Sequence, residues 1–239
     1  MTYDIIATLG PACASPEIWQ EMIAAGATQF RLNSSHLSVA EVVAWVERLR
    51  VYFDLHRLSL PVVVDLQGSK WRLGQVPTAE LSAGQCVRLI HASKSHTQAV
   101  LPVPHNDFFA AAPVSSRELR LNDAKVLLDI EEIGADFILA RITQGGTIAA
   151  HKGITFAESG FRAEGLGEKD RSVLTATQQY PFVRYAISYV KDVDEMIAYR
   201  KQIGATIYLI AKLERRQAVE DAQTIAMEAD EVWLCRGDL

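Results

Sequence analysis

Two apolar segments near the end of the 239-residue chain each finish in charged residues. The first closes on Lys212 and Glu214, and the second closes on Arg236 and Asp238. Side chains two residues apart on a β-strand point to the same side, so each pair would share one face of its strand. A lysine between two carboxylates at neighbouring strand ends suits a site that binds a divalent cation beside an anionic substrate.

Three of these residues have a distinct task in such a site. Mg²⁺ prefers one or two carboxylates together with waters and substrate oxygens, and Glu214 and Asp238 would supply the carboxylates. Lys212 would be the positive charge that stabilises a developing enolate or a transferring phosphoryl oxygen. The alternative is a buried ion pair between Lys212 and one of the carboxylates, an arrangement that adds little stability.

Polar residues also gather where two earlier apolar segments end. Arg31, Asn33 and Ser35 alternate, so all three would point the same way. The alternative is a capping and turn cluster that leads into the following helix. Asp65 directly follows three valines, which favours a cation or a hydrogen-bond donor as its partner over a turn or cap. Arg72 carries a planar fork of donors that suits phosphate, although a lone arginine near a glycine is more often a surface residue.

Short apolar runs that alternate with amphipathic segments would position these residues. Repeated βα units of this kind predict an α/β fold with a parallel sheet. In (β/α)₈ barrels of the TIM type, reactive groups lie at the carboxyl ends of the strands. A closed barrel needs eight strands, so we expect an incomplete barrel of about six, with two more beyond Leu239. The expected strands are 5–9, 29–33, 61–65, 182–190, 207–214 and 232–236.

The pattern changes after the third strand. Residues 81–90, 119–130 and 137–142 are β-like and are separated by glycine-containing turns, without a long helix. We therefore predict an all-β domain inserted after strand three. The predicted domains are 1–74 and 155–239 for the barrel, and 75–154 for the insertion.

Composition excludes several classes of function. The net charge of −5 provides no basic surface for nucleic acid. No apolar run approaches the ~20 residues that cross a membrane, and the amino terminus does not resemble a signal peptide. Three widely spaced cysteines argue against a disulfide framework or a zinc site. We expect a cytoplasmic protein that binds neither nucleic acid nor membrane.

Taken in order, these segments resemble pyruvate kinases. Any one motif is modest evidence, but seven occur in the family's order, with the insertion in the expected place. The motifs lie at residues 5–12, 31–36, 65–74, 167–170, 188–191, 210–214 and 235–239.

The resemblance implies a phosphotransferase of glycolysis that transfers a phosphoryl group between phosphoenolpyruvate and ADP, giving pyruvate and ATP. It implies that Lys212 stabilises the enolate or the moving phosphoryl group. Glu214 and Asp238 would bind Mg²⁺ or Mn²⁺. Full-length relatives are expected to be homo-oligomers.

The resemblance also assigns the remaining candidates. A K⁺ site would use the side chains of Asn33, Ser35 and Asp65 with the carbonyl of Leu66. The resemblance also implies a set of residues that contact the substrate phosphate or the nucleotide: Arg31, Asn33, Arg72, Lys152, Ser188 and Gly237. Of these, Lys152 would lie on a mobile β lid.

The sequence departs from the family pattern near the expected phosphate and K⁺ sites. Leu66 stands where the family has threonine, Gln67 where lysine is usual, and Ser69 and Lys70 replace a Pro-Glu pair. The family's seventh strand, with a catalytic threonine, would lie past Leu239. We therefore expect an amino-terminal portion of such an enzyme that is a poor catalyst by itself. The alternatives are a metal-dependent lyase or aldolase that forms a pyruvate enolate, and a degenerate kinase-like binding protein.

Overall fold

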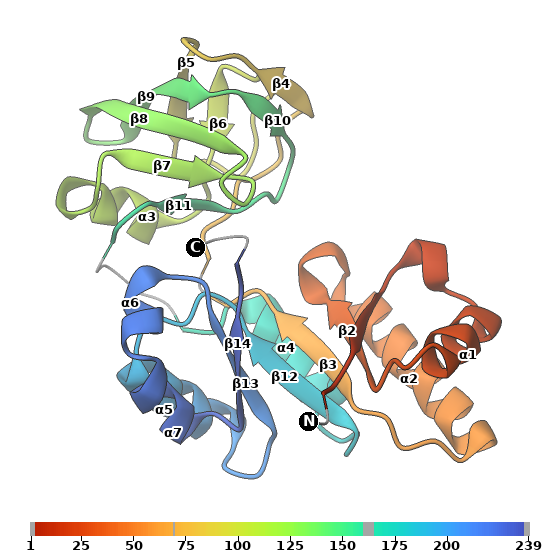
Figure 1. The fold of residues 1–239 in the computed structure, drawn as a ribbon. Coiled ribbons are helices and arrows are strands. Elements are labelled where there is room, and N and C mark those ends of the chain that lie inside the picture. Colours follow the sequence, from red (N-terminus) through yellow and green to blue (C-terminus); the bar gives the residue numbers. More distant parts are fainter. Residues whose placement is uncertain (1–2, 69, 160–164, 237–239) are drawn as a thin grey trace. The chain divides into compact units, whose positions relative to one another are not determined.

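The structure is a computed structural model that describes residues 3–68, 70–159 and 165–236 (Figure 1). The chain forms two compact units. The first combines the residues up to 68 with those from 165 onward, and the second comprises the residues between them. The units therefore divide at 68 and 165, whereas the sequence pattern placed the domain boundaries near 74 and 154.

Six parallel strands form the sheet of the first unit, and each strand neighbours the next in chain order. Figure 1 shows them as a curved sheet. The strands are β1 (Ile6–Leu9), β2 (Gln29–Asn33), β3 (Val62–Leu66), β12 (Val183–Ile187), β13 (Leu209–Leu213) and β14 (Glu231–Leu234). This α/β arrangement with parallel strands agrees with the expectation from the βα rhythm.

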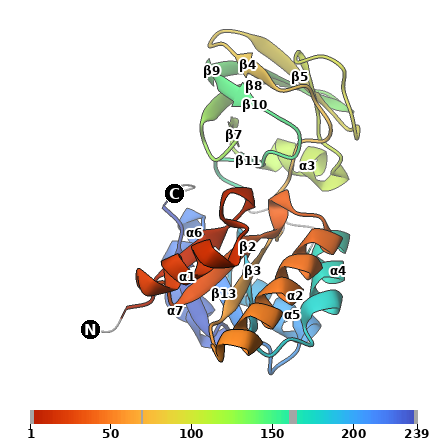
Figure 2. The ribbon, with the colours of Figure 1, turned by 90° about the vertical axis from the view of Figure 1, so that its right-hand side faces the viewer.

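Helices connect these strands, and Figure 2 shows α2 and α4 side by side. They are α1 (Pro16–Ala24), α2 (Val39–His56), α4 (Glu168–Thr177), α5 (Val193–Ile203), α6 (Arg216–Glu220) and α7 (Ala222–Glu228), with short 3₁₀ turns η1 (Pro11–Cys13) and η2 (Ser34–His36). None of the helices within the described ranges is long and apolar enough to cross a membrane.

Side-chain caps define where two of these helices begin. The Ser38 hydroxyl accepts a hydrogen bond from the amide of Glu41, and the Glu41 carboxylate accepts one from the amide of Ser38 at 2.7 Å. Asp192 caps α5 in the same way through the amide of Glu195. The segment between β13 and β14 forms two short helices, because the backbone leaves helical geometry at Asp221.

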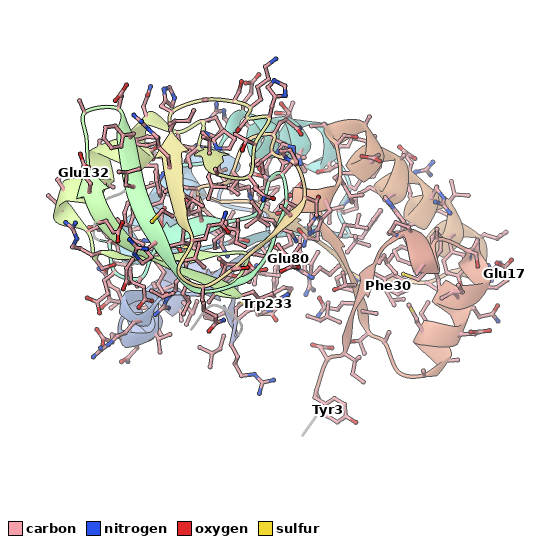
Figure 3. All side chains as sticks on the ribbon, turned by 90° about the horizontal axis from the view of Figure 1, so that it is seen from above. Tyr3, Glu17, Phe30, Glu80, Glu132 and Trp233 are labelled. Atoms are coloured by element: carbon pink, nitrogen blue, oxygen red, sulfur yellow. The ribbon has the colours of Figure 1, made fainter. Side chains whose placement is uncertain are left out.

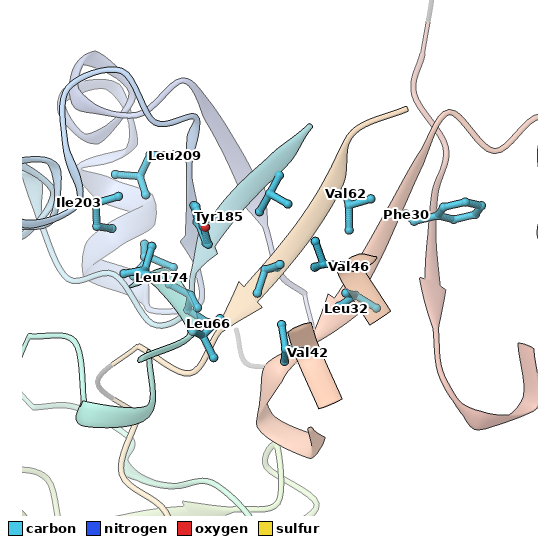
Figure 4. Packing of buried hydrophobic residues seen from close by; sticks show 14 of the residues in the cluster. Phe30, Leu32, Val42, Val46, Val62, Leu66, Leu174, Tyr185, Ile203 and Leu209 are labelled. Atoms are coloured by element: carbon cyan, nitrogen blue, oxygen red, sulfur yellow. The ribbon is translucent and has the colours of Figure 1, made fainter. Parts of the chain in front are cut away.

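Alternate residues of the parallel strands lie on opposite faces of the sheet. One face packs against the helices; Figure 4 shows Leu32 and Val62 beside Val42 and Val46 of α2. Full burial of one such side chain contributes about 1.5–3 kcal/mol. The opposite face carries a smaller apolar cluster of fully buried residues and, nearer the carboxyl ends of the strands, buried polar groups. That smaller cluster contains Val63, Ala186 and Ile210.

The second unit is mostly β and has its own hydrophobic core. Its main sheet has the order β11-β7-β8-β9-β5-β6, and β4 pairs with β10. Charged side chains such as Glu132 are exposed on this unit (Figure 3). The strands are β4 (Ala79–Leu81), β5 (Cys86–Ile90), β6 (Val100–Pro102), β7 (Glu118–Leu121), β8 (Val126–Ile133), β9 (Phe137–Gln144), β10 (Gly146–Ile148) and β11 (Ile154–Phe156).

Two details of the second unit differ from the sequence prediction. The unit is not wholly β, because it contains the short helix α3 (Asn106–Ala111) and the 3₁₀ turn η3 (Ala112–Val114). The single β-like run predicted at 119–130 is two strands, β7 and β8. Asn122, Asp123 and Ala124 reverse the chain between them, with φ of 56°, 56° and 57°. Asn and Asp tolerate this left-handed conformation better than most residues.

Candidate active site

Strand alternation brings the predicted polar residues to the face of the sheet opposite the helices. Asn33 at the end of β2 is the register partner of Asp65 in β3, and Asp65 is the partner of Ala186 in β12. Ser188 follows β12 directly, and Lys212 lies in β13. Residues that are far apart in the chain therefore meet at the carboxyl end of the parallel sheet.

The carboxylate of Asp65 is the centre of this group and is only 2% exposed. Arg31 donates from Nε to Asp65 Oδ2 at 2.8 Å, and its Nη2 also contacts Oδ2. Arg31 is held from the other side by Thr8, whose hydroxyl lies 3.0 Å from Nη1. Lys212 Nζ reaches the same Asp65 oxygen at 3.2 Å. One buried carboxylate thus orients two positively charged side chains, those of Arg31 and Lys212.

Ser188 links the other oxygen of Asp65 to the backbone. Its Oγ lies 3.1 Å from Asp65 Oδ1 and 2.7 Å from the carbonyl oxygen of Leu66. Ser188 Oγ also accepts a hydrogen bond from Lys212 Nζ at 3.0 Å. Because a hydroxyl has one proton, Ser188 can donate to only one of the two oxygens at a time while it accepts from Lys212.

Lys212 uses all three of its ammonium donors, since Nζ also lies 2.8 Å from Glu214 Oε1. Burial acts to lower the pKa of Lys212, but the carboxylates of Asp65 and Glu214 act in the opposite sense and leave that pKa above its ordinary value. Lys212 is therefore a fixed, desolvated positive charge. The buried ion pair between Lys212 and Glu214 that the sequence offered as the alternative is present, and Asp65 is a second carboxylate partner of Lys212.

Glu214 is buried, and its second oxygen accepts a hydrogen bond from the amide of Tyr189 at 2.9 Å. Close by, burial raises the pKa of the Cys235 thiol to about 12, and the charge of Glu214 adds to this effect. Cys235 is consequently a neutral thiol beside the charged group. Asp238 and Gly237, which the sequence also predicted for the site, lie outside the described residues.

No group of three or more His, Cys, Asp or Glu side chains suited to a metal ion is found in the part of the chain that the structure describes. The oxygen-rich set predicted for K⁺ contains a single carboxylate, so it is not a group of that kind. Within it, Asn33 Oδ1 caps the turn η2 by accepting from the amide of Ser35 at 3.0 Å. The capping role considered from the sequence therefore also holds for Asn33.

Arg72 and Lys152 belong to the second unit. Arg72 Nη1 donates to the carbonyl of His151 at 3.1 Å, and the backbone of Arg72 pairs with Gly153. The carbonyl of Lys152 accepts from the amide of Leu73. The two cationic residues are therefore carried by adjacent backbone segments of one unit.

Sequence reasoning missed three contributors to the charged group. Thr8 contacts Arg31, Ser34 donates to the backbone carbonyl of Asp65 at 2.7 Å, and the amide of Tyr189 binds Glu214. Thr8 and Ser34 lie inside two of the family motifs, at 5–12 and 31–36. Membership of these motifs was the only signal for them, because the periodicity of the strands does not single them out. Tyr189 acts through its backbone, so its side-chain type carried no signal.

A buried lysine between two carboxylates lies at the carboxyl end of a parallel α/β sheet, which is where βα-barrel enzymes carry their reactive groups. The family model "Pyruvate kinase, barrel domain" matches residues 2–239. The chain belongs to the pyruvate kinase family.

Individual relatives agree with this assignment. A pyruvate kinase of Mycobacterium intracellulare is 32% identical over 240 residues, covering 98% of this chain and 51% of the relative. One of Agrobacterium vitis is 29% identical, covering 98% and 49%, and pyruvate kinase 2 of a Synechocystis strain is 29% identical, covering 98% and 41%. The chain thus spans about half the length of the curated relatives it matches.

Proposed function

We propose that the protein to which this chain belongs transfers a phosphoryl group between phosphoenolpyruvate and ADP, giving pyruvate and ATP in glycolysis. The observation that carries the proposal is the buried Lys212 ammonium, which Asp65, Ser188 and Glu214 hold at the carboxyl edge of the sheet. The names of the relatives support it and do not favour the lyase or aldolase alternative. A glycolytic enzyme would act in the cytoplasm.

Lys212 is suited to this chemistry because removal of the phosphoryl group from phosphoenolpyruvate leaves an enolate oxygen. A positive charge already desolvated and oriented stabilises that oxygen without reorganising at the moment of reaction. The carboxylates of Asp65 and Glu214 keep the pKa of Lys212 raised, so it remains an ammonium. Arg31 would contact the substrate phosphate from β2, and Ser188 would help to orient the bound substrate.

We propose that Glu214 and Asp238 hold Mg²⁺ or Mn²⁺. Carboxylate oxygens are the donors that these hard cations prefer. When bound, the cation would neutralise charge on the phosphoryl and enolate oxygens.

For K⁺ we propose the side chains of Asn33, Ser35 and Asp65 with the Leu66 carbonyl. These are all oxygen donors, and the register that pairs Asn33 with Asp65 supports their convergence.

The second unit is proposed to be the β lid of the family, inserted after β3 of an incomplete (β/α)₈ barrel. Its internal core and its place in the chain between β3 and α4 support this. Arg72 would contact phosphate, and Lys152 and Gly237 would act on the nucleotide side. Like its full-length relatives, the protein is proposed to form homo-oligomers.

Binding of Mn²⁺, followed by electron paramagnetic resonance of the free ion, tests the proposal independently of turnover. We expect the chain to bind Mn²⁺ and phosphoenolpyruvate to tighten that binding. Glu214→Gln should weaken Mn²⁺ binding at least about tenfold, since it removes one of two carboxylate ligands. The matched control is Glu220→Gln, which alters an exposed carboxylate on α6. Equal affinities in the two variants, or no effect of phosphoenolpyruvate on the wild type, would refute the proposal.

A further inference from the structure

The first turn of α4 contacts the main chain that follows Asp65. The carboxylate of Asp170 is 1% exposed. Its Oδ1 accepts from the amide of Gln67 at 3.1 Å, and its Oδ2 accepts from the amide of Gly68 at 2.9 Å. Hydrogen bonds to a charged acceptor are stronger than neutral ones, so two of them on consecutive amides fix this turn firmly.

The turn that Asp170 holds runs tightly against Ser188. Gly68 has φ of +60°, and a Cβ at this position would lie 2.1 Å from the carbonyl oxygen of Ser188. A side chain is therefore excluded at residue 68 on both backbone and steric grounds. The carboxylate of Asp170 thus keeps the backbone of residues 67–68 against Ser188. The hydroxyl of Ser188 in turn links Asp65 to Lys212.

A second contact from the same turn reaches the end of β2. Lys169 Nζ donates to the carbonyl oxygen of Ser34 at 2.7 Å. The Ser34 side chain is fully buried, and its hydroxyl donates to the carbonyl of Asp65. Lys169 is therefore connected to Asp65 through a single residue.

We propose that Lys169 and Asp170 are positioning residues for the Lys212 site. Asp170 fixes the backbone after β3, Lys169 fixes the backbone after β2, and together they hold Asp65 where it orients Lys212 and Arg31. Neither residue needs to touch the substrate. The activity readout below rests on the proposed function, whereas the exchange readout does not.

The test uses amide hydrogen exchange and steady-state kinetics on Asp170→Asn and Lys169→Met. Asparagine keeps the size of aspartate but has one acceptor oxygen and no charge, so the amides of Gln67 and Gly68 should exchange at least about tenfold faster. Turnover, measured as pyruvate release, should fall about 10- to 100-fold, mainly in kcat, because Asp65 is no longer held in place. Glu168→Gln is the matched control, since Glu168 is an exposed acid in the same helical turn.

Asp170→Glu provides a second variant that keeps the charge and should recover part of the turnover lost in Asp170→Asn. Unchanged protection of Gln67 and Gly68 in Asp170→Asn would overturn the proposal, as would equal kinetic losses in Asp170→Asn and Glu168→Gln. If the wild type released no pyruvate, the proposed function would fail while the exchange data would still decide the positioning role.

Discussion

The two faces of the parallel sheet use the same strands in opposite ways. Toward the helices, residues such as Leu32 and Val64 are fully buried among apolar neighbours. On the other face, at the carboxyl end, Asp65 and Lys212 are almost as deeply buried but are charged. Apolar burial stabilises the fold, whereas a buried ion pair does so weakly, because desolvation offsets the attraction. The charged face is therefore better explained by chemistry than by stability.

The largest loss of stability is expected when the carboxylate of Asp65, which contacts both Lys212 and Arg31, is removed. Asp65→Asn leaves Lys212 and Arg31 without the carboxylate that both contact, and removal of one partner from a buried pair costs about 3–5 kcal/mol. Urea unfolding followed by circular dichroism measures it. The control is Asp54→Asn, where the ion pair with Arg50 is largely exposed and the expected change is about 0–1 kcal/mol. If both variants lost a similar amount of unfolding free energy, the buried contacts of Asp65 would contribute no more to stability than an exposed ion pair does.

Leu32→Ala alters the apolar face of β2 without touching the charged face. The side chain is fully buried, so we expect a loss of about 2–5 kcal/mol from lost transfer energy and the cavity left behind. Mn²⁺ affinity of the folded fraction should be unchanged. A variant as stable as the wild type, or one that folds but no longer binds Mn²⁺, would contradict the separation of the two faces.

Tyr185 brings a hydroxyl into the apolar face, where burial raises its pKa from 10.0 to about 12. A raised pKa favours the protonated form in the folded state. The associated stability of about 2–3 kcal/mol is therefore complete below pH 10 and is lost as the pH rises through 12.

Tyr185→Phe removes this titration, and Thr177 keeps its hydrogen bond to the carbonyl of Val173. Urea midpoints at pH 8, 10 and 11 should fall less steeply with pH in Tyr185→Phe than in the wild type. The other groups that titrate at high pH are the same in both proteins, so the difference between the two profiles isolates Tyr185. Parallel pH profiles would contradict the raised pKa.

The smallest effect is expected at Cys235. With a pKa of about 12, its thiolate fraction at pH 8 is about 10⁻⁴, and the thiolate is the reactive form. Iodoacetamide labelling followed by mass spectrometry should modify the exposed Cys86 first. Glu214→Gln should speed labelling of Cys235 a few-fold, since it removes a charge that raises the pKa. Labelling of Cys235 as fast as that of Cys86 would contradict this environment.

Local features of the fold could be predicted from the sequence because they depend on neighbouring residues. The strand predicted at 61–65, with its three consecutive valines, is an example and forms as β3. The split of the 119–130 segment at Asn122 was missed, because apolar spacing continues on both sides of a turn that only backbone conformation reveals.

The candidate site was predictable in its residue types but not in its pairing. Lys212 and Asp65 are 147 residues apart, and nothing in either segment indicates that they would meet. The same holds for Asp170, whose carboxylate binds amides more than 100 residues away. Strand register brings Lys212 beside Asp65, whereas Asp170 reaches the end of β3 from helix α4. The βα pattern indicates the order of these elements but neither contact.

Pyruvate formation from phosphoenolpyruvate and ADP, with Mg²⁺ and K⁺ present, is the most direct test of the central claim that Lys212 is the catalytic charge. It is measured in a coupled assay at high protein concentration on the wild type and on Lys212→Met, with Lys201→Met, an exposed lysine of α5, as control. We predict measurable turnover that falls about 100- to 1000-fold in Lys212→Met and is unchanged in Lys201→Met. Turnover in Lys212→Met within a few-fold of the wild type would contradict the account.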